Sequence, residues 1–454
     1  MPKFIVIVLL LATVGFWQEK QVDVPPNVIL ILSDDQGTLD LHSYGAEDLH
    51  TPHLDAFAHK GIRFTQFYAA APVCSPSRGA VLTGRYPQKN GVINNSHSLK
   101  PGEITIAEML KGAGYTTGHF GKWHIGHGRP GKDYPAKAHG PNTEGFDEST
   151  GFLSGVVDYW SHFNYGGASW GDPPRRHDLQ KNGKEIWRSG THTGDLIVDE
   201  SLNFIDQQSD TPFFVYAAFG SPHYPMQPYD KYMALYEHLP MQRRQYAALV
   251  STMDEQIGRL LTGLDDRGLR ENTLIIFMSD HGHSTEARAD HGGGYAGPFR
   301  GAKFSLFEGG IRVPAIISLP EQIPTGEVRH QIATGMDWLP TIADYTNAEL
   351  PEHGIDGKSL RRLIENAKSS SPHAAIHWHR PGGESQWAVR EGNWKLIGNP
   401  SDTDRSKVPA NEKIFLSDLS KDSTETVNLA GEYKDVVRRL TKLHEEWLAS
   451  VTLP

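Results

Sequence analysis

The sequence is poor in cysteine, in positive charge and in long apolar runs. Its single cysteine in 454 residues excludes an intramolecular disulfide, a cysteine-rich zinc site and a dithiol redox pair. Its 44 Lys and Arg against 54 Asp and Glu give a net charge of −10, which argues against nucleic acid or an anionic membrane as a partner. The composition is otherwise that of a globular protein, and the length predicts two or three domains.

The longest apolar run lies at the N-terminus. It extends from Phe4 to Trp17 after Lys3 and ends at the polar residues 18–21. The run is shorter than the roughly 20 residues that span a membrane as a helix, but it suits the core of a signal peptide. We therefore expect residues 1–19 to be a signal peptide and the protein to be exported, periplasmic or secreted, with no stable membrane anchor. The alternative is a buried first strand or helix.

Four short apolar runs each lead directly into polar residues, as buried parallel strands do. They cover residues 27–32, 115–120, 212–217 and 273–278, and helical patterns at 104–111, 195–207 and 242–264 fall between them. This alternation predicts an α/β fold with a large mixed, mostly parallel sheet sandwiched by helices. Because the carboxyl ends of parallel strands line one edge of a sheet, we expect the polar residues after them to converge there.

The pattern changes near residue 370. Residues 386–390 and 393–397 flank Glu391-Gly392 as a hairpin would, residues 412–418 suggest a third strand, and residues 432–450 form an amphipathic helix. The sequence therefore predicts a main domain at residues 24–369. A smaller subdomain at residues 370–454, with an antiparallel sheet and a helix, is expected to pack on it.

Acidic residues follow two of the predicted strands. Asp34-Asp35 comes after the first strand and Asp280-His281 after the last. Each pair alone is explained by a helix cap followed by a turn. On neighbouring strand ends, however, three carboxylates and an imidazole suit a hard divalent cation such as Ca²⁺, Mg²⁺ or Mn²⁺.

Cys74 precedes a predicted helix start. Pro76 near the first turn, with Ser77 as a cap, would place Cys74 at a helix N-terminus, where the dipole lowers a thiol pKa and attracts anions. The alternative is a lone buried cysteine. Cationic side chains in the same regions would complete a pocket for sulfate or phosphate. They are Arg78, Lys122, His124, His223 and Lys303.

Residues 74–85 resemble the sulfatase signature Cys-x-Pro-Ser-Arg-x-x-x-Leu-Thr-Gly-Arg at every defined position. Further segments resemble motifs of the same family in the same order, at residues 27–37, 121–126, 221–225 and 303–314. The chain is therefore identified as a member of the type I, formylglycine-dependent sulfatase family. It is similar to arylsulfatases and N-acetylgalactosamine sulfatases of the alkaline-phosphatase superfamily.

The resemblance implies the chemistry and the roles. Cys74 would be oxidised to formylglycine by a maturation enzyme, and its hydrated aldehyde would attack the sulfur of a sulfate ester. One Ca²⁺ would be bound by Asp34, Asp35, Asp280, His281 and the formylglycine, although many relatives have Asn in place of His281. Arg78 and Lys122 would hold the formylglycine and sulfate oxygens. His124 would act as the base, and His223 and Lys303 would contact the sulfate, one of them assisting the leaving oxygen.

The substrate follows less directly. Residues 158–162 resemble a segment of N-acetylgalactosamine-4-sulfatases, and Trp160, Tyr165 and Trp170 would either stack on a sugar or simply pack. With export, this favours a sulfated polysaccharide such as a glycosaminoglycan or an algal galactan. Two other functions stay open. One is a phosphate- or phosphonate-ester hydrolase of the same superfamily, and the other is a sulfated-glycan binder in which Cys74 is never oxidised.

Overall fold

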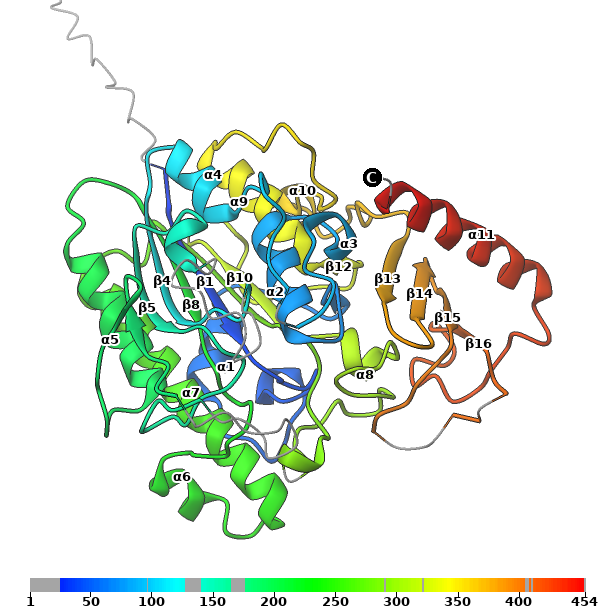
Figure 1. Cartoon of the computed structure of the whole chain (residues 1–454), viewed down its shortest axis with the longest axis horizontal. Helices are drawn as coiled ribbons and strands as arrows, with labels where there is room; N and C mark the ends of the chain where they lie inside the picture. The colour runs from blue at the N-terminus through cyan, green and yellow to red at the C-terminus, as the bar shows by residue number, and fades with distance from the viewer. Residues whose placement is uncertain are drawn as a thin grey trace, which may run out of the picture.

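A computed structural model describes residues 25–95, 97–126, 140–164, 176–289, 291–320, 322–404, 408–409 and 411–452. Within them, ten strands form the main sheet (Figure 1). In spatial order they are β11 (Glu327–Arg329), β2 (Ile62–Phe64), β10 (Ala315–Ser318), β9 (Thr273–Ser279), β1 (Asn27–Ser33), β8 (Phe213–Ala218), β4 (Thr116–Lys122), β5 (Glu148–Phe152), β6 (Gln180–Lys181) and β7 (Lys184–Glu185).

The four strands predicted from the sequence are the centre of this sheet. β9, β1, β8 and β4 are consecutive and parallel, and the register pairs Asn27 with Thr273 and Ser33 with Ser279. Every residue of β1, β8 and β9 is buried, which explains their continuous apolar runs. β10 is antiparallel to β9, so the sheet is mixed but mostly parallel, as predicted.

Helices cover both faces of the sheet. α1 (Pro52–His59), α5 (Thr193–Asp206) and α7 (Met241–Asp266) pack with Ile29 and Ile31 on one face. α2 (Cys74–Thr83), α4 (Ile106–Gly112) and α9 (Trp338–Thr346) pack with Val28, Leu30 and Leu32 on the other. Alternate side chains of one strand thus serve two cores. The predicted helices at 104–111, 195–207 and 242–264 are confirmed as α4, α5 and α7.

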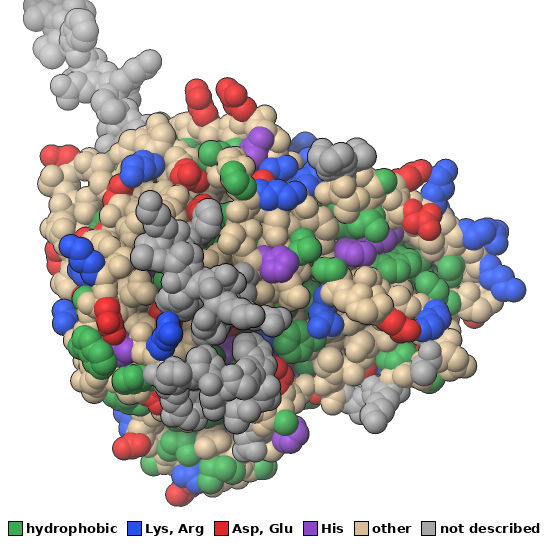
Figure 2. Space-filling model, viewed as in Figure 1, with side chains coloured by type: hydrophobic (Ala, Val, Ile, Leu, Met, Phe, Trp, Pro, Cys, Tyr) green, Lys and Arg blue, Asp and Glu red, His purple; other side chains and the backbone are tan. Residues whose placement is uncertain are grey.

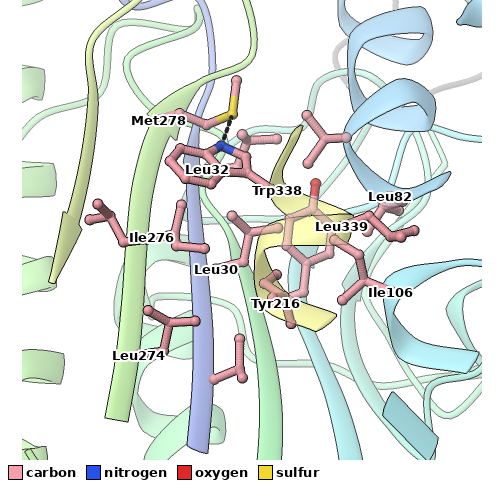
Figure 3. Close-up of a cluster of buried hydrophobic side chains, with 14 of the residues drawn as sticks. Leu30, Leu32, Leu82, Ile106, Tyr216, Leu274, Ile276, Met278, Trp338 and Leu339 are labelled. Carbon is pink, nitrogen blue, oxygen red and sulfur yellow. Dashed lines mark hydrogen bonds between the residues drawn. The ribbon is translucent and has the colours of Figure 1, made fainter. Parts of the chain in front are cut away.

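Figure 3 shows how the second of these cores joins the elements. Leu30 and Leu32 of β1 pack in one cluster with Ile276 and Met278 of β9 and with the α9 side chain Trp338. The Trp338 indole donates a hydrogen bond to the Met278 sulfur at 3.1 Å. This packing holds the central strands against the last turn of α2, through Val81 and Leu82, and so fixes the helix whose first turn lies at the candidate site.

Shorter elements complete the main body. They are the two-stranded sheet of β3 (Phe67–Tyr68) and β12 (Ala333–Thr334), and helices α3 (Pro87–Asn90), α6 (Asp230–Leu235), α8 (Glu308–Ile311) and α10 (Arg361–Glu365). Among the residues that the structure describes, no helix combines the length and the apolar character needed to span a bilayer. The predicted signal peptide lies outside the described residues.

A second sheet lies beside the main body (Figure 1). Its antiparallel strands are β13 (Ile376–Arg380), β14 (Gln386–Glu391), β15 (Trp394–Gly398) and β16 (Ile414–Asp418), and α11 (Lys434–Val451) covers one face. We call residues 376–451 the C-terminal unit. The predicted hairpin, third strand and helix are confirmed, whereas β13 was missed. The division of the chain at residue 370 stays a prediction.

The C-terminal unit has its own core and a second contact with the main body. Val389, Leu396 and Leu416 pack under Leu440 of α11. On the other face of the sheet, Trp378 packs with main-body residues and donates a hydrogen bond to the Ala69 carbonyl at 2.8 Å. The unit is therefore held against the segment that leads into α2.

Candidate active site

Polar residues from four neighbouring strands meet at the carboxyl edge of the main sheet. Asp34 and Asp35 follow β1, Lys122 ends β4, Asp280 follows β9, and His223 lies beyond β8. The Asp280 backbone NH donates to Ser33 at 3.0 Å, and the Asp34 NH donates to Ser221 at 3.1 Å. The structure thus brings together residues that are far apart in the chain, as the strand order requires.

Buried cations face the carboxylates. The Lys122 ammonium lies 2.5 Å from Asp34 Oδ2, and Arg78 Nη2 lies 3.0 Å from Asp280 Oδ2 and 3.5 Å from Asp34 Oδ1. All four of these side chains are almost completely buried. On the face shown in Figure 2, exposed charges of both signs are interspersed. The positive charge that would hold an anion at the site comes from the buried side chains of Lys122 and Arg78.

Cys74 opens α2 and is 1% exposed. The helix N-cap is Val73, with no side-chain cap, so the prediction of Ser77 as the cap is wrong. The helix already begins at Cys74, because proline is tolerated in a first turn, and Ser77 lies inside it. Its hydroxyl donates instead to the Asp280 carbonyl at 2.5 Å. The predicted place of Cys74 at a helix N-terminus is confirmed.

Four side chains present metal-ligand atoms within 4.8 Å of one another: Asp34, Asp35, Cys74 and His281. His281 Nε2 lies 3.2 Å from Cys74 Sγ and 3.3 Å from Asp35 Oδ1. Asp34 Oδ1 and Asp35 Oδ1 are buried and receive no hydrogen bond. Asp280 lies beside the group, with Oδ1 3.6 Å from His281 Nε2. Unbonded buried carboxylate oxygens are costly unless a cation binds them, so this donor set fits a divalent metal ion.

The two neighbouring carboxyl groups have opposite pKa shifts. Burial opposes ionisation of Asp34, but the charge of the neighbouring Lys122 holds its pKa well below the ordinary value. Burial raises the pKa of Asp35 to about 7, although Lys303, whose ammonium is 2.9 Å from its Oδ2, opposes the rise. Without a further positive charge, Asp35 is thus only partly ionised at neutral pH beside the ionised Asp34.

The thiol lies in a strongly positive environment. Burial alone raises the pKa of Cys74, but Lys122 and Lys303 more than offset it, and the pKa falls to about 6. The same surroundings that favour a thiolate favour any anion bound next to residue 74.

Two further histidines, besides His281, lie at this edge. Burial and Lys303 hold the pKa of His223 well below its ordinary value, and its Nδ1 donates to the Tyr224 carbonyl at 2.7 Å. Its Nε2 is 3.6 Å from Asp35 Oδ2. His124 has a positive φ of 54°, and its carbonyl accepts the Ser75 hydroxyl at 2.5 Å, which ties it to the first turn of α2.

Several neighbours of the site were missed from the sequence. Glu286 Oε2 lies 3.4 Å from the Lys303 ammonium. The only feature of the sequence that could have indicated this contact is the position of Glu286 on the loop after Asp280. The Tyr159 hydroxyl bonds the carbonyls of Gly220 and His223 at 2.5 and 2.7 Å, for which the sequence gives no signal. Trp160 packs edge-on against His192 and is 36% exposed. Tyr165 and Trp170 lie outside the described residues.

One cluster lies at the carboxyl edge of the sheet. It contains buried ammonium and guanidinium groups, paired carboxylates and an acidic thiol at a helix N-terminus. Such a cluster suits a hydrolase that acts on esters of a tetrahedral oxyanion. The sequence comparisons decide which oxyanion. The Sulfatase family model matches residues 26–348, and a model described as N-sulphoglucosamine sulphohydrolase, C-terminal, matches residues 301–449. The chain belongs to the sulfatase family and is a sulfuric ester hydrolase.

Individual relatives agree over most of the chain. Arylsulfatase A of Homo sapiens is 32% identical, covering 92% of this chain and 87% of the relative. N-acetylgalactosamine-6-sulfatase of Sus scrofa is 36% identical, covering 82% and 71%. The crystal structure of Ps i-CgsB in complex with k-i-k-neocarrahexaose superimposes with a TM-score of 0.80 at 30% identity, covering 93% and 92%. The predicted alkaline-phosphatase-like fold is confirmed.

Proposed function

We propose that this protein is an exported sulfatase that removes sulfate from a sulfated polysaccharide or glycosaminoglycan-type sugar, using a formylglycine made from Cys74 and one bound Ca²⁺. The observation that carries the proposal is the place of Cys74. Its sulfur lies 3.2 Å from His281 Nε2, inside a buried group of metal-ligand atoms that includes Asp34 and Asp35.

A thiol does not suit such a site. Ca²⁺ prefers oxygen ligands, and a thiolate is a soft ligand that favours other metals. Oxidation of Cys74 by a formylglycine-generating enzyme would place oxygen at this position, which matches Asp34, Asp35 and Asp280 as Ca²⁺ ligands, with His281 completing the set. This modification also gives an exported protein a use for a single cysteine.

When formed, the formylglycine supplies a nucleophilic oxygen at position 74. Lys122 and Arg78, fixed by Asp34 and Asp280, hold that oxygen and the sulfate oxygens from buried positions, where low dielectric strengthens their effect. His124, tied to α2 through Ser75, removes the proton that releases the bound sulfate.

His223 and Lys303, both close to Asp35, would also contact the sulfate. An anion raises the pKa of a neighbouring imidazole, so His223 can take a proton at Nε2 and contact a sulfate oxygen. Burial disfavours charge on Lys303, but Asp35 and Cys74 hold its pKa well above the ordinary value. Lys303 therefore stays protonated, and one of the two, Lys303 or His223, assists the leaving oxygen.

The substrate class and export rest on separate support. The relatives include an N-acetylgalactosamine-6-sulfatase and a structural neighbour solved with a carrahexaose, which favours a sulfated sugar. The apolar run before residue 18 favours export.

A first experiment tests the nucleophile and the reaction together. In protein co-expressed with a formylglycine-generating enzyme, the tryptic peptide containing Cys74 should have the mass of an aldehyde in place of the thiol. The same protein should release sulfate from an aryl sulfate and from sulfated oligosaccharides. A thiol mass with binding but no release would support a glycan binder. Faster turnover of phosphate or phosphonate monoesters would support a different hydrolase.

Removal of Ca²⁺ should destabilise the protein and stop turnover. Without the cation, Asp34 and Asp35 lie side by side in the interior with unbonded oxygens. A ligand at 1,000 times its Kd stabilises by about 4 kcal/mol, so chelation with EGTA should lower Tm by on the order of 5 °C. Added Ca²⁺ should restore both properties, whereas the Tm of Asp35→Asn should not respond to EGTA. Unchanged melting and activity in protein shown to be metal-free would contradict the calcium assignment.

A further inference from the structure

The residue after Lys303 has a strained backbone. Phe304 adopts a φ of 72°, in the left-handed region that is unfavourable for any residue with a side chain. Its NH donates to the Pro72 carbonyl at 2.8 Å, close to Cys74, and its carbonyl accepts Gln386 Nε2 at 3.2 Å. Backbone strain of this kind persists only where neighbouring groups enforce it. Here the neighbouring groups are Pro72, in the segment just before α2, and Gln386 of the C-terminal unit.

The C-terminal unit also holds Lys303 itself. The Thr403 hydroxyl, in the loop between β15 and β16, donates to the Lys303 carbonyl at 2.8 Å. The Thr403 carbonyl accepts Thr285 at 2.5 Å, and the Ser305 hydroxyl donates to the Ser401 carbonyl at 2.7 Å. Both carbonyls of the strained Lys303–Phe304 turn are therefore bonded by side chains of the C-terminal unit.

A buried charge cluster fixes that unit against the same segment. The Lys395 ammonium lies 3.0 Å from Glu308 and 3.1 Å from Glu425, and none of the three side chains is exposed to solvent. The Glu308 NH also donates to Glu425 Oε2 at 2.6 Å. Because loss of one partner in a buried ion pair leaves an uncompensated charge, this cluster strongly resists separation of the two bodies.

The position of the Lys303 ammonium depends on this backbone. The Lys303 NH donates to the His283 carbonyl at 2.8 Å, and its ammonium reaches Asp35 at 2.9 Å. Released from the left-handed turn, the backbone would relax and carry the side chain with it. A misplacement of about 1 Å in a site of this kind costs about 10²-fold in rate.

We propose that Thr403 and Gln386 are positioning residues for sulfate hydrolysis. By donating hydrogen bonds to the two carbonyls of the Lys303–Phe304 turn, these residues of the C-terminal unit fix the position of the Lys303 ammonium relative to the sulfate. This inference rests on the proposed function, in which Lys303 contacts the sulfate. The hydroxyl and the amide act on backbone atoms, so neither is a catalytic group.

The test combines Thr403→Val with Gln386→Met, which remove the two shorter hydrogen bonds to these carbonyls at nearly constant volume and leave only the longer bond from Arg380 Nη1 to the Phe304 carbonyl, at 3.5 Å. In the Ca²⁺-loaded enzyme with formylglycine, kcat/KM for an aryl sulfate should fall by about 10- to 100-fold. The affinity for inorganic sulfate, measured by calorimetry without turnover, should fall as well. Thr403→Ser keeps the hydroxyl, so its kcat/KM and sulfate affinity should be much closer to those of the original protein than the values for Thr403→Val. Thr424→Val removes a similar half-buried hydroxyl that bonds only Asp422, and it should leave both quantities unchanged.

The same pair of substitutions in Lys303→Met protein distinguishes positioning from general damage. If they act through the Lys303 ammonium, sulfate affinity in this background should not fall further. An equal loss with and without the lysine would overturn the inference while leaving the proposed function intact. Normal turnover and normal sulfate affinity in Lys303→Met itself would instead contradict the role of Lys303 in the proposed function, and with it the basis of the inference.

Discussion

Cys74→Ala is expected to reduce turnover by on the order of 10⁵-fold and to leave the fold intact. The substitution removes one sulfur atom from the first turn of α2, where alanine is a good helix former. The cavity is small, so the free energy of unfolding should fall by only about 1 kcal/mol. Activity should nevertheless disappear because residue 74 can no longer supply a nucleophilic oxygen.

Sulfate release and far-UV circular dichroism on the same preparation separate these two effects. Thr83→Ser is the matched control, because it removes one methyl group at the other end of α2 and keeps the hydroxyl that bonds Gly79. The turnover of Thr83→Ser should equal that of the protein without substitutions. Substantial turnover by Cys74→Ala would mean that some other group attacks the sulfur, and the nucleophile assignment would be wrong.

The central strands could be predicted from sequence because their signal is local. β1, β8 and β9 are fully buried, so each is a continuous apolar run, and each run stops where polar residues begin. β2 has only three residues and is defined by pairing with Ile317 and its neighbours, far away in the chain. β13 reads Ile-His-Trp-His-Arg, and its alternation was too short and too polar to stand out. Such strands are fixed by tertiary contacts.

The residues of the site also fall into two groups, those that a local sequence pattern marks and those that only tertiary contacts reveal. The residues at strand ends were predicted because sheet order brings them together, whatever the loops do. Thr403 and Gln386 act on the carbonyls of Lys303 and Phe304 across long separations, and no pattern in the sequence marks a bond to a backbone oxygen. Ser77 was misassigned because the sequence pattern of a serine just after a proline is the same whether the serine caps a helix or lies inside it. Only the helix start at Cys74 distinguishes them.

Lys122→Met is expected to damage both stability and activity. Lys122 is fully buried with its ammonium 2.5 Å from Asp34 Oδ2, so the substitution leaves Arg78, at 3.5 Å, as the nearest cationic side chain to Asp34. Loss of one partner of a buried pair typically costs about 3–5 kcal/mol of unfolding free energy. Loss of a preorganised charge next to a developing anion costs about 10²- to 10³-fold in kcat.

Two further variants separate these contributions. Lys111→Met breaks an exposed pair with Asp147, so its unfolding free energy should change by less than about 1 kcal/mol and its turnover not at all. Lys122→Met with Asp34→Asn removes the unpaired buried charge, so denaturant titrations in EGTA, where no metal contributes to either protein, should show a higher unfolding free energy than for Lys122→Met alone. Turnover should stay low in that double variant, because both a sulfate contact and a metal ligand are gone. If Lys122→Met alone lost stability but kept full turnover, Lys122 would be the counter-ion of Asp34 and no part of the sulfate site.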